Sequence, residues 1–220
     1  MNFTKAFTYI FDDRRWLEKL VIPLLVTLIP VIGWMVAAGY LLRVTRNVAE
    51  HQVEPLPELE FGADLSRGFK LFVANLLYGL PIVVVSTLLF LPLGLSGNSG
   101  STNFFAIALA ILGGLLILLY ALFVAIIMPA VNANLAVKEQ IGAAFEFKEI
   151  FRMIGNNFKA WLIVIGGTIL CSVFIAPIGG IILVVGAIIT GFYSQLIIAH
   201  LTGQAYAHSQ APGGQDAPLY

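Results

Sequence analysis

The sequence predicts an all-α protein, a polytopic transmembrane helical bundle, and three observations support this prediction. Hydrophobic residues make up 59% of the 220 residues and charged residues only 11%, whereas soluble domains carry about 25% charged residues. Residues 20–42, 71–137 and 160–215 contain no Asp, Glu, Lys or Arg. All twelve Lys and Arg residues lie in clusters outside these three segments. A water-soluble chain of this length could not bury so much apolar surface, but lipid solvates it.

The charge-free segments are long enough to form several membrane-spanning helices. Crossing a hydrocarbon core of ~30 Å takes about 20 residues at 1.5 Å per residue. Residues 71–137 hold two spans, about 71–93 and 104–135, joined by a loop rich in Ser, Gly and Asn. Residues 160–200 hold two more spans. Pro177 and the pair of glycines shortly after it predict a turn between these two spans. Together with the first charge-free segment they give about six hydrophobic segments in three hairpins.

The first charge-free segment, residues 20–42, allows two interpretations. It is either one span of 23 residues or two short helices broken at residues 30–33, which contain a proline and a glycine. Basic residues collect on the cytoplasmic side of membrane proteins, and only the two-helix interpretation puts every basic cluster on one side. We therefore expect a short or re-entrant first hairpin surrounded by protein. We also expect a multi-pass protein of the prokaryotic cell membrane with both termini in the cytoplasm.

Each hairpin follows a stretch in which large apolar residues recur every three or four positions, the period of an amphipathic helix. Charged residues occupy positions between them. Basic amphipathic helices with aromatic faces lie in the membrane interface, so we expect an interfacial amphipathic helix before each hairpin. The apolar positions are Phe3, Phe7, Ile10 and Phe11 in the first stretch, Phe61, Leu65 and Phe69 in the second, and Phe147, Ile150, Phe151, Ile154 and Phe158 in the third.

The repeated order of helix and hairpin predicts one membrane domain, residues 1–206. Its three pseudo-repeats cover about residues 1–52, 61–140 and 145–206. Residues 207–220 contain two prolines and a glycine pair, and have the composition of a flexible C-terminal tail. We expect His208, which lies within this tail, to be in solvent.

Several motifs in about the first 75 residues resemble a known family. They are the run Gly39-Tyr40-Leu41-Leu42-Arg43-Val44-Thr45-Arg46-Asn47, the run Pro55-Leu56-Pro57-Glu58, the pair Phe61-Gly62 and the run Gly68-Phe69-Lys70. This series is similar to the prokaryotic membrane-protein family catalogued as domain of unknown function 4013, and the likeness extends over about residues 3–205. The resemblance implies a polytopic bacterial or archaeal membrane protein. It implies no known activity and no known catalytic residue.

Four basic residues near the ends of the predicted spans form a candidate site: Arg43, Arg46, Arg67 and Lys70. Arginine binds phosphate through paired hydrogen bonds, so these residues are candidates for contact with an anion or a lipid headgroup. The alternative is a cytoplasmic anchor with local ion pairs, because several glutamates follow Arg46. We favour the alternative, since basic residues are expected at span ends on topology alone.

Small residues recur every four positions on two of the hydrophobic segments. Ala106, Ala110 and Gly114 do so on the fourth segment, and Ala187 and Gly191 on the sixth. Small residues at this spacing let helices approach closely, so the five residues form a candidate helix-packing seam. The seam is either intramolecular or a homo-oligomer contact. We favour the intramolecular alternative, because a bundle of six segments has many internal contacts to fill.

The sequence carries no motif that assigns an activity. It contains no GxxxxGK[ST], HExxH, CxxC or GxSxG pattern. The formal net charge is zero, so no overall field favours nucleic acid. Charged groups are missing from the spans, and His200 stands alone at the end of the last span, where we expect it at the membrane interface. These absences argue against an enzyme, a metal or other cofactor, a nucleic-acid partner and proton coupling.

Two function classes remain. The first is a non-enzymatic scaffold or a subunit of a membrane assembly, with membrane lipids and either its own copies or other membrane subunits as partners. The second is a channel or transporter for a neutral or apolar solute. A polar-lined cavity between the hairpins would support the second class, and a closed apolar centre would oppose it.

Overall fold

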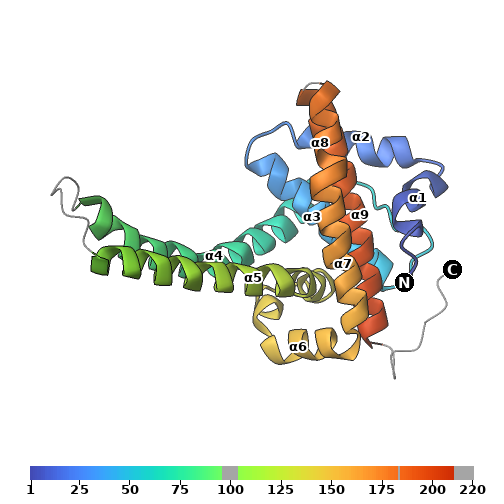
Figure 1. Cartoon of the computed structure of the whole chain (residues 1–220). Coiled ribbons are helices and arrows are strands. Elements are labelled where there is room, and N and C mark those ends of the chain that lie inside the picture. Colours follow the sequence, from blue (N-terminus) through green and yellow to red (C-terminus); the bar gives the residue numbers. More distant parts are fainter. Residues whose placement is uncertain (96–103, 183, 211–220) are drawn as a thin grey trace. The chain divides into compact units, whose positions relative to one another are not determined.

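The computed structural model describes residues 1–95, 104–182 and 184–210, with side chains at 1–90, 107–180 and 186–210. Over these residues every regular element is helical, so the all-α class is confirmed (Figure 1). The α-helices are α1 (Lys5–Asp12), α2 (Trp16–Val26), α3 (Ile32–Ala49), α4 (Phe61–Leu95), α5 (Phe104–Lys138), α6 (Phe147–Asn156), α7 (Phe158–Leu170), α8 (Ala176–Ile178) and α9 (Val184–Gln210). Shorter helical turns are η1 (Ile141–Phe145), η2 (Cys171–Ile175) and η3 (Gly179–Ile182).

The chain forms two compact units, where the sequence predicts a single domain. Unit 1 consists of Met1–Phe72 and Pro129–Tyr220, and unit 2 consists of Val73–Met128. Unit 2 therefore contains the second hairpin, and unit 1 contains the remaining elements. Each unit is described by itself below.

Three helical segments in the described part of the chain are long and apolar enough to cross a membrane: Phe61–Phe90, Ile107–Lys138 and Phe158–Ile178. At most 22% of the residues in their apolar windows are buried within the protein. Such exposed apolar helices are compatible with lipid as their surroundings. Of the about six hydrophobic segments that we expect, the structure thus supports three as spans by length and composition, and the arrangement in three hairpins stays a prediction.

The first charge-free segment is broken into two helices. Helix α2 ends at Val26 and α3 begins at Ile32. Pro30 lies in the break, and Val31 has a φ of 64°, which interrupts the helical backbone. A Cβ at Gly33 would lie 1.8 Å from the backbone oxygen of Val26, so this close return requires glycine. The break excludes one continuous helical span and agrees with the two-helix interpretation.

Only two of the three amphipathic stretches form helices of their own. The first and third form separate helices, α1 and α6. The second does not: Phe61 begins α4, which continues without interruption to Leu95. Our expectation of a separate second interfacial helix is therefore wrong. No proline separates Lys70 from the apolar run that follows, so nothing ends the helix there.

The two arms of the third hairpin lie side by side in unit 1, as Figure 1 shows for α7 and α9. The first arm remains helical through Ile178, and the chain then turns at Gly179–Ile182. A Cβ at Gly179 would lie 2.0 Å from the backbone oxygen of Gly186, so the turn brings the two arms into backbone contact. The predicted turn at the glycine pair is therefore present.

Helix α9 extends into the segment that we expected to be a flexible tail. It ends at Gln210 rather than before residue 207. His208 is only 2% exposed, so our expectation that it lies in solvent is wrong. The helix packs on α6 and α7, where the Ser209 hydroxyl accepts a hydrogen bond of 3.0 Å from Trp161 Nε1. Residues 211–220 of the predicted tail lie outside the described residues.

Glycines set how the helices of unit 1 cross α3. A Cβ at Gly39 would lie 1.8 Å from the backbone oxygen of Asp64, and one at Gly68 would lie 1.7 Å from that of Met35. These distances are far shorter than van der Waals contact, so α3 and α4 cross backbone against backbone. On α9, a Cβ at Gly203 would approach the backbone of α3 to 2.4 Å. The crossing brings the polar C-terminal half of α3 beside the first turns of α4.

Candidate functional site

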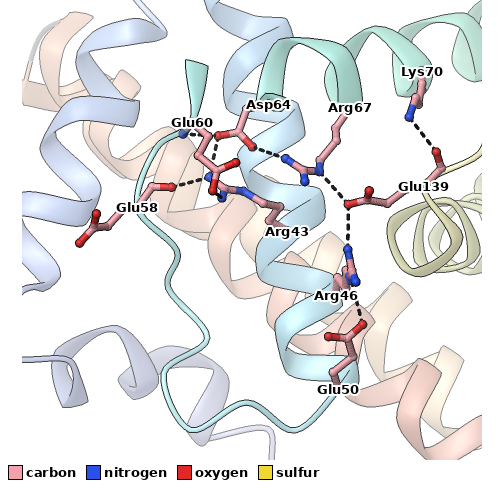
Figure 2. A network of polar contacts seen from close by, with 9 residues as sticks. All are labelled: Arg43, Arg46, Glu50, Glu58, Glu60, Asp64, Arg67, Lys70 and Glu139. Atoms are coloured by element: carbon pink, nitrogen blue, oxygen red, sulfur yellow. Dashed lines mark hydrogen bonds and ion pairs between the residues drawn. The ribbon is translucent and has the colours of Figure 1, made fainter. Parts of the chain in front are cut away.

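The four basic residues of the candidate site come together in unit 1 (Figure 2). Arg43 and Arg46 lie one turn apart on α3, and Arg67 and Lys70 lie one turn apart on the beginning of α4. Residues three apart share one face of a helix. The α3–α4 crossing therefore places the two pairs opposite each other. Glu139, directly after α5, lies between them.

Arg43 is the most enclosed of the three arginines, with 11% of its side chain exposed, against 37% for Arg46 and 19% for Arg67. Its Nη2 donates to Asp64 Oδ2 at 2.7 Å and to the backbone oxygen of Glu58, and its Nη1 donates to Glu60 Oε1 at 2.8 Å. The side chain of Asp64 is fully buried. Asp64 Oδ2 also accepts from the backbone N–H of Glu60 at 2.9 Å, which holds the chain just before α4. Arg43 thus neutralises a buried carboxylate at the beginning of α4.

Glu139 joins the other three basic residues. Its Oε1 accepts from Arg46 Nη1 at 2.9 Å and from Arg67 Nε at 2.8 Å, and its backbone oxygen accepts from Lys70 Nζ at 2.8 Å. The backbone N–H of Glu139 donates to Leu135 at the end of α5. One residue therefore ties the end of α5 to α3 and α4 through hydrogen bonds to charged groups, which are stronger than neutral ones.

Charge and space both argue against an anion in this cluster. The three arginines contact four carboxylates, those of Glu50, Glu60, Asp64 and Glu139, which balance the charge of all four basic side chains, and Lys70 contacts the backbone oxygen of Glu139. The cavity beside Arg67, Lys70 and Glu139 measures about 10 Å³, which is about the room of one water molecule. The geometry therefore favours local ion pairs, the alternative that we preferred from the sequence, over a lipid-phosphate site.

Because of Glu139, the stability of the protein should depend on pH in the acidic range. Burial opposes its ionisation, but hydrogen bonds and charge from Arg67 and Arg46 outweigh burial and lower its pKa from 4.5. A carboxyl whose pKa is lowered on folding contributes stability above its unfolded pKa and loses it as the pH falls through the folded pKa. We expect Glu139→Gln to lower the melting temperature at neutral pH, and the difference from wild type to shrink as the pH falls below about 4.5.

The measurement is thermal denaturation of purified protein in detergent over this pH range. Glu18→Gln is the matched control, because Glu18 is exposed and forms no ion pair within the described chain. If the Glu139→Gln variant kept a constant difference from wild type at every pH, the ionised carboxylate would not be the stabilising group.

The candidate packing seam is not where the described helices meet most closely. A Cβ at Gly114 or Gly191 would have no described neighbour within 4 Å. Among the described glycines of unit 2, the tightest is the adjacent Gly113, where a Cβ would lie 2.1 Å from Leu89 Cδ1. Ala110 and Ala187 are half-buried, and the side chain of Ala106 lies outside the described residues. An intramolecular seam through Gly114 and Gly191 is thus not seen, and a homo-oligomer contact there stays a prediction.

Sequence reasoning missed a second polar site in unit 1, a cavity of about 370 Å³. It lies among α1, α9 and the segment after α3, and its walls include Tyr9, His200 and Gln204. His200 is 5% exposed and stacks on Tyr9 with ring centroids 4.2 Å apart, so its ring is buried within the protein, and its place at the membrane interface stays a prediction. The signal in the sequence was the spacing of four between His200 and Gln204, which places both side chains on one face of α9.

Comparison with known proteins gives a family but no activity. The family described as Protein of unknown function (DUF4013) matches residues 22–191. The chain is 29% identical over 192 residues to the Uncharacterized protein MJ1189 of Methanocaldococcus jannaschii, and the match covers 83% of this chain. The same match covers 63% of that relative, so the chain spans less than two thirds of its length. No solved structure matches the chain.

Proposed function

This chain belongs to the DUF4013 family, and from that premise we propose that it is a non-enzymatic membrane protein that acts as a scaffold or as a subunit of a membrane assembly. One observation carries the proposal: the apolar surface of unit 2. The sequence of Val73–Met128 contains no Asp, Glu, Lys, Arg or His. Leu88, Ile111 and Leu116 are each more than 60% exposed. Side chains of this kind contact lipid or the apolar surface of another membrane protein.

The interior of unit 2 offers little to a channel that would carry a polar solute. A cavity of about 210 Å³ between its two arms is lined by Pro81, Ile82, Val85, Leu116, Ile117 and Tyr120. Its lining supplies almost no polar group to replace the hydration of an ion or polar solute. The polar cavity of unit 1 lies beside α1 and the segment after α3, rather than between two of the apolar spans. These two cavities therefore give little support to a channel for a polar solute, and the test below addresses a channel for an apolar one.

A site-specific photocrosslinking experiment tests the scaffold proposal. A photoreactive residue at Leu88, Ile111 or Leu116 in living cells should give adducts with a protein of one defined mass, because a partner would cover these apolar positions. Val53 in unit 1, which is 99% exposed, serves as the control and should not give that adduct. Adducts with lipid alone at all three positions, together with uptake of a neutral solute by reconstituted liposomes, would favour the channel alternative.

We further propose that the protein is a multi-pass protein of the prokaryotic cell membrane, with its basic clusters and both termini in the cytoplasm. The positive-inside rule supports this orientation. In a variant that lacks Cys171, cysteines introduced at the exposed positions Gln52 and Lys148 should resist an impermeant thiol reagent in intact cells and react after lysis. Labelling of either position from outside would contradict the proposed orientation.

A further inference from the structure

The cavity beside His200 has the size and the walls of a small-molecule site. Its volume of about 370 Å³ falls in the usual range for ligand pockets, about 300–1,000 Å³. Val48 in the last turn of α3, and Val53 and Pro55 in the segment after it, give the cavity an apolar wall. Charged and polar side chains from α1, from α9 and from the segment after α3 complete the wall, and those of that segment are His51, Gln52 and Glu54. All of the residues that line the cavity belong to unit 1.

Hydrogen bonds fix the protonation of His200. Gln204 Oε1 accepts from the backbone N–H of Asn2 at 2.8 Å, and Gln204 Nε2 donates to the backbone oxygen of Asn2 at 3.2 Å. These two contacts set the orientation of the amide, so its second N–H donates to His200 Nδ1 at 2.9 Å. His200 is therefore neutral, with its proton on Nε2. That N–H has no acceptor within the described residues, and a ligand oxygen in the cavity would supply one.

Carboxylates outnumber ammonium groups around the cavity. Lys5 pairs with Asp12 at 2.8 Å, while Lys19 is shared by Asp13 at 2.6 Å and Glu54 at 3.1 Å. His51 also lines the cavity and is counted as neutral in the formal charge at pH 7, so two ammonium groups face three carboxylates, and one negative charge is left. A negatively charged recess with apolar walls favours a cationic ligand.

The residues that line the cavity also indicate which class of cation it would bind. Among the described residues no group of three His, Cys, Asp or Glu side chains is placed to hold a metal ion. A quaternary ammonium group requires open aromatic faces, but His200 is stacked on the Tyr9 ring. A primary ammonium group instead carries three N–H donors, which suit several carboxylates.

We propose that this cavity binds a primary amine that carries an oxygen atom on a neighbouring carbon, with its ammonium group beside Asp12 and Glu54 and its oxygen accepting from His200 Nε2. Free ethanolamine and the headgroup of phosphatidylethanolamine share this chemistry. In the headgroup, the phosphate oxygens provide the acceptor. The site does not depend on the proposed scaffold role, so either proposal can fail without the other.

Calorimetric titration of the purified full chain with ethanolamine tests the proposal. We expect saturable binding that weakens by roughly fivefold or more for ethylamine, which lacks the oxygen that accepts a hydrogen bond, and for choline, which lacks N–H donors. A second arm compares nanodiscs of phosphatidylethanolamine with nanodiscs of phosphatidylglycerol. Selective thermal stabilisation by phosphatidylethanolamine, without binding of free ethanolamine, assigns the lipid headgroup as the ligand. Absence of both effects overturns the proposal.

Matched variants locate the site. Glu54→Gln should weaken binding by roughly three- to fivefold, the effect of losing one partly exposed ion pair. Glu58→Gln, which changes an exposed glutamate of the same segment outside the cavity, should leave binding unchanged. His200→Phe keeps an aromatic ring against Tyr9 and should remove the preference for ethanolamine over ethylamine. Equal effects of Glu54→Gln and Glu58→Gln, or a preference that survives in a folded His200→Phe variant, would overturn the assignment.

Discussion

Gly68→Ala is expected to destabilise the protein by about 3 kcal/mol, near the upper end of the usual cost of overpacking. The physical reason is a collision with backbone. A Cβ at Gly68 would lie 1.7 Å from the backbone oxygen of Met35 and 2.5 Å from its carbonyl carbon. A side-chain neighbour could change rotamer, but a helix backbone moves only as a whole. The new methyl group must therefore push α3 and α4 apart. Thermal denaturation in detergent, followed by circular dichroism, measures the effect.

Gly62→Ala in the same helix is the matched control. A Cβ at Gly62 would meet nothing within 4 Å among the described residues, so this change should be neutral or slightly stabilising, because alanine has the higher helix propensity. Gly39→Ala on α3 should behave like Gly68→Ala, since its Cβ would lie 1.8 Å from the backbone oxygen of Asp64. Equal melting temperatures for the Gly62→Ala and Gly68→Ala variants would mean that the two helices do not cross in backbone contact.

Composition and charge pattern predicted much of the fold. The helical class, the apolar segments and the family could all be predicted from the sequence. The family match over residues 22–191 confirms the resemblance. The break between α2 and α3 could also be predicted, because a proline and a glycine mark it. The crossing of α3 and α4 in backbone contact could not be predicted. Small residues that repeat along one helix mark a packing seam in a sequence, but the crossing uses a single glycine on each helix, Gly39 and Gly68. A lone glycine carries no periodic signal.

Amphipathic periodicity predicted the helices but not what covers their apolar faces. Ile150 on α6 is fully buried within the protein, whereas Phe147 and Phe151 on the same helix are 45% and 49% exposed. On α1, Ile10 is buried and Phe11 is 58% exposed. One apolar stripe can thus be shared between the protein core and the surroundings. Apolar residues that face the core and apolar residues that face the surroundings recur with the same period of 3.6 residues. The sequence alone therefore cannot tell which residues of the stripe are buried within the protein.

The candidate site shows the same limit in electrostatic terms. The sequence brought out four basic residues and the nearby glutamates, and local pairing such as that of Arg46 with Glu50 was foreseeable from a spacing of four. The central position of Glu139 was not foreseeable, because it lies 93 residues from Arg46. Long-range pairing depends on the helix crossing, which the sequence does not reveal. The same holds for the cavity, where Asn2 contacts Gln204 across 202 residues.

Arg43→Gln is the second change for which we expect a large effect, a destabilisation of about 3–5 kcal/mol, the usual result of removing one partner of a buried ion pair. The carboxylate of Asp64 would stay fully buried. It would keep the backbone N–H of Glu60 at 2.9 Å, and Arg67 at the longer distance of 3.4 Å. Neither replaces the charged contact of 2.7 Å from Arg43. Since Asp64 also fixes the chain before α4, the loss should loosen the beginning of that helix, which hydrogen exchange would detect.

Two further variants separate loss of the pair from a general loss of charge. Arg152→Gln removes a cation whose side chain is 58% exposed and which pairs with Glu149 on the same helix, so it should change stability by less than about 0.5 kcal/mol. Adding Asp64→Asn to Arg43→Gln removes the uncompensated buried charge and should recover part of the lost stability. If Arg43→Gln were as mild as Arg152→Gln, water would have to reach Asp64, and the pair would be one exposed contact among several rather than the anchor of α4 on α3.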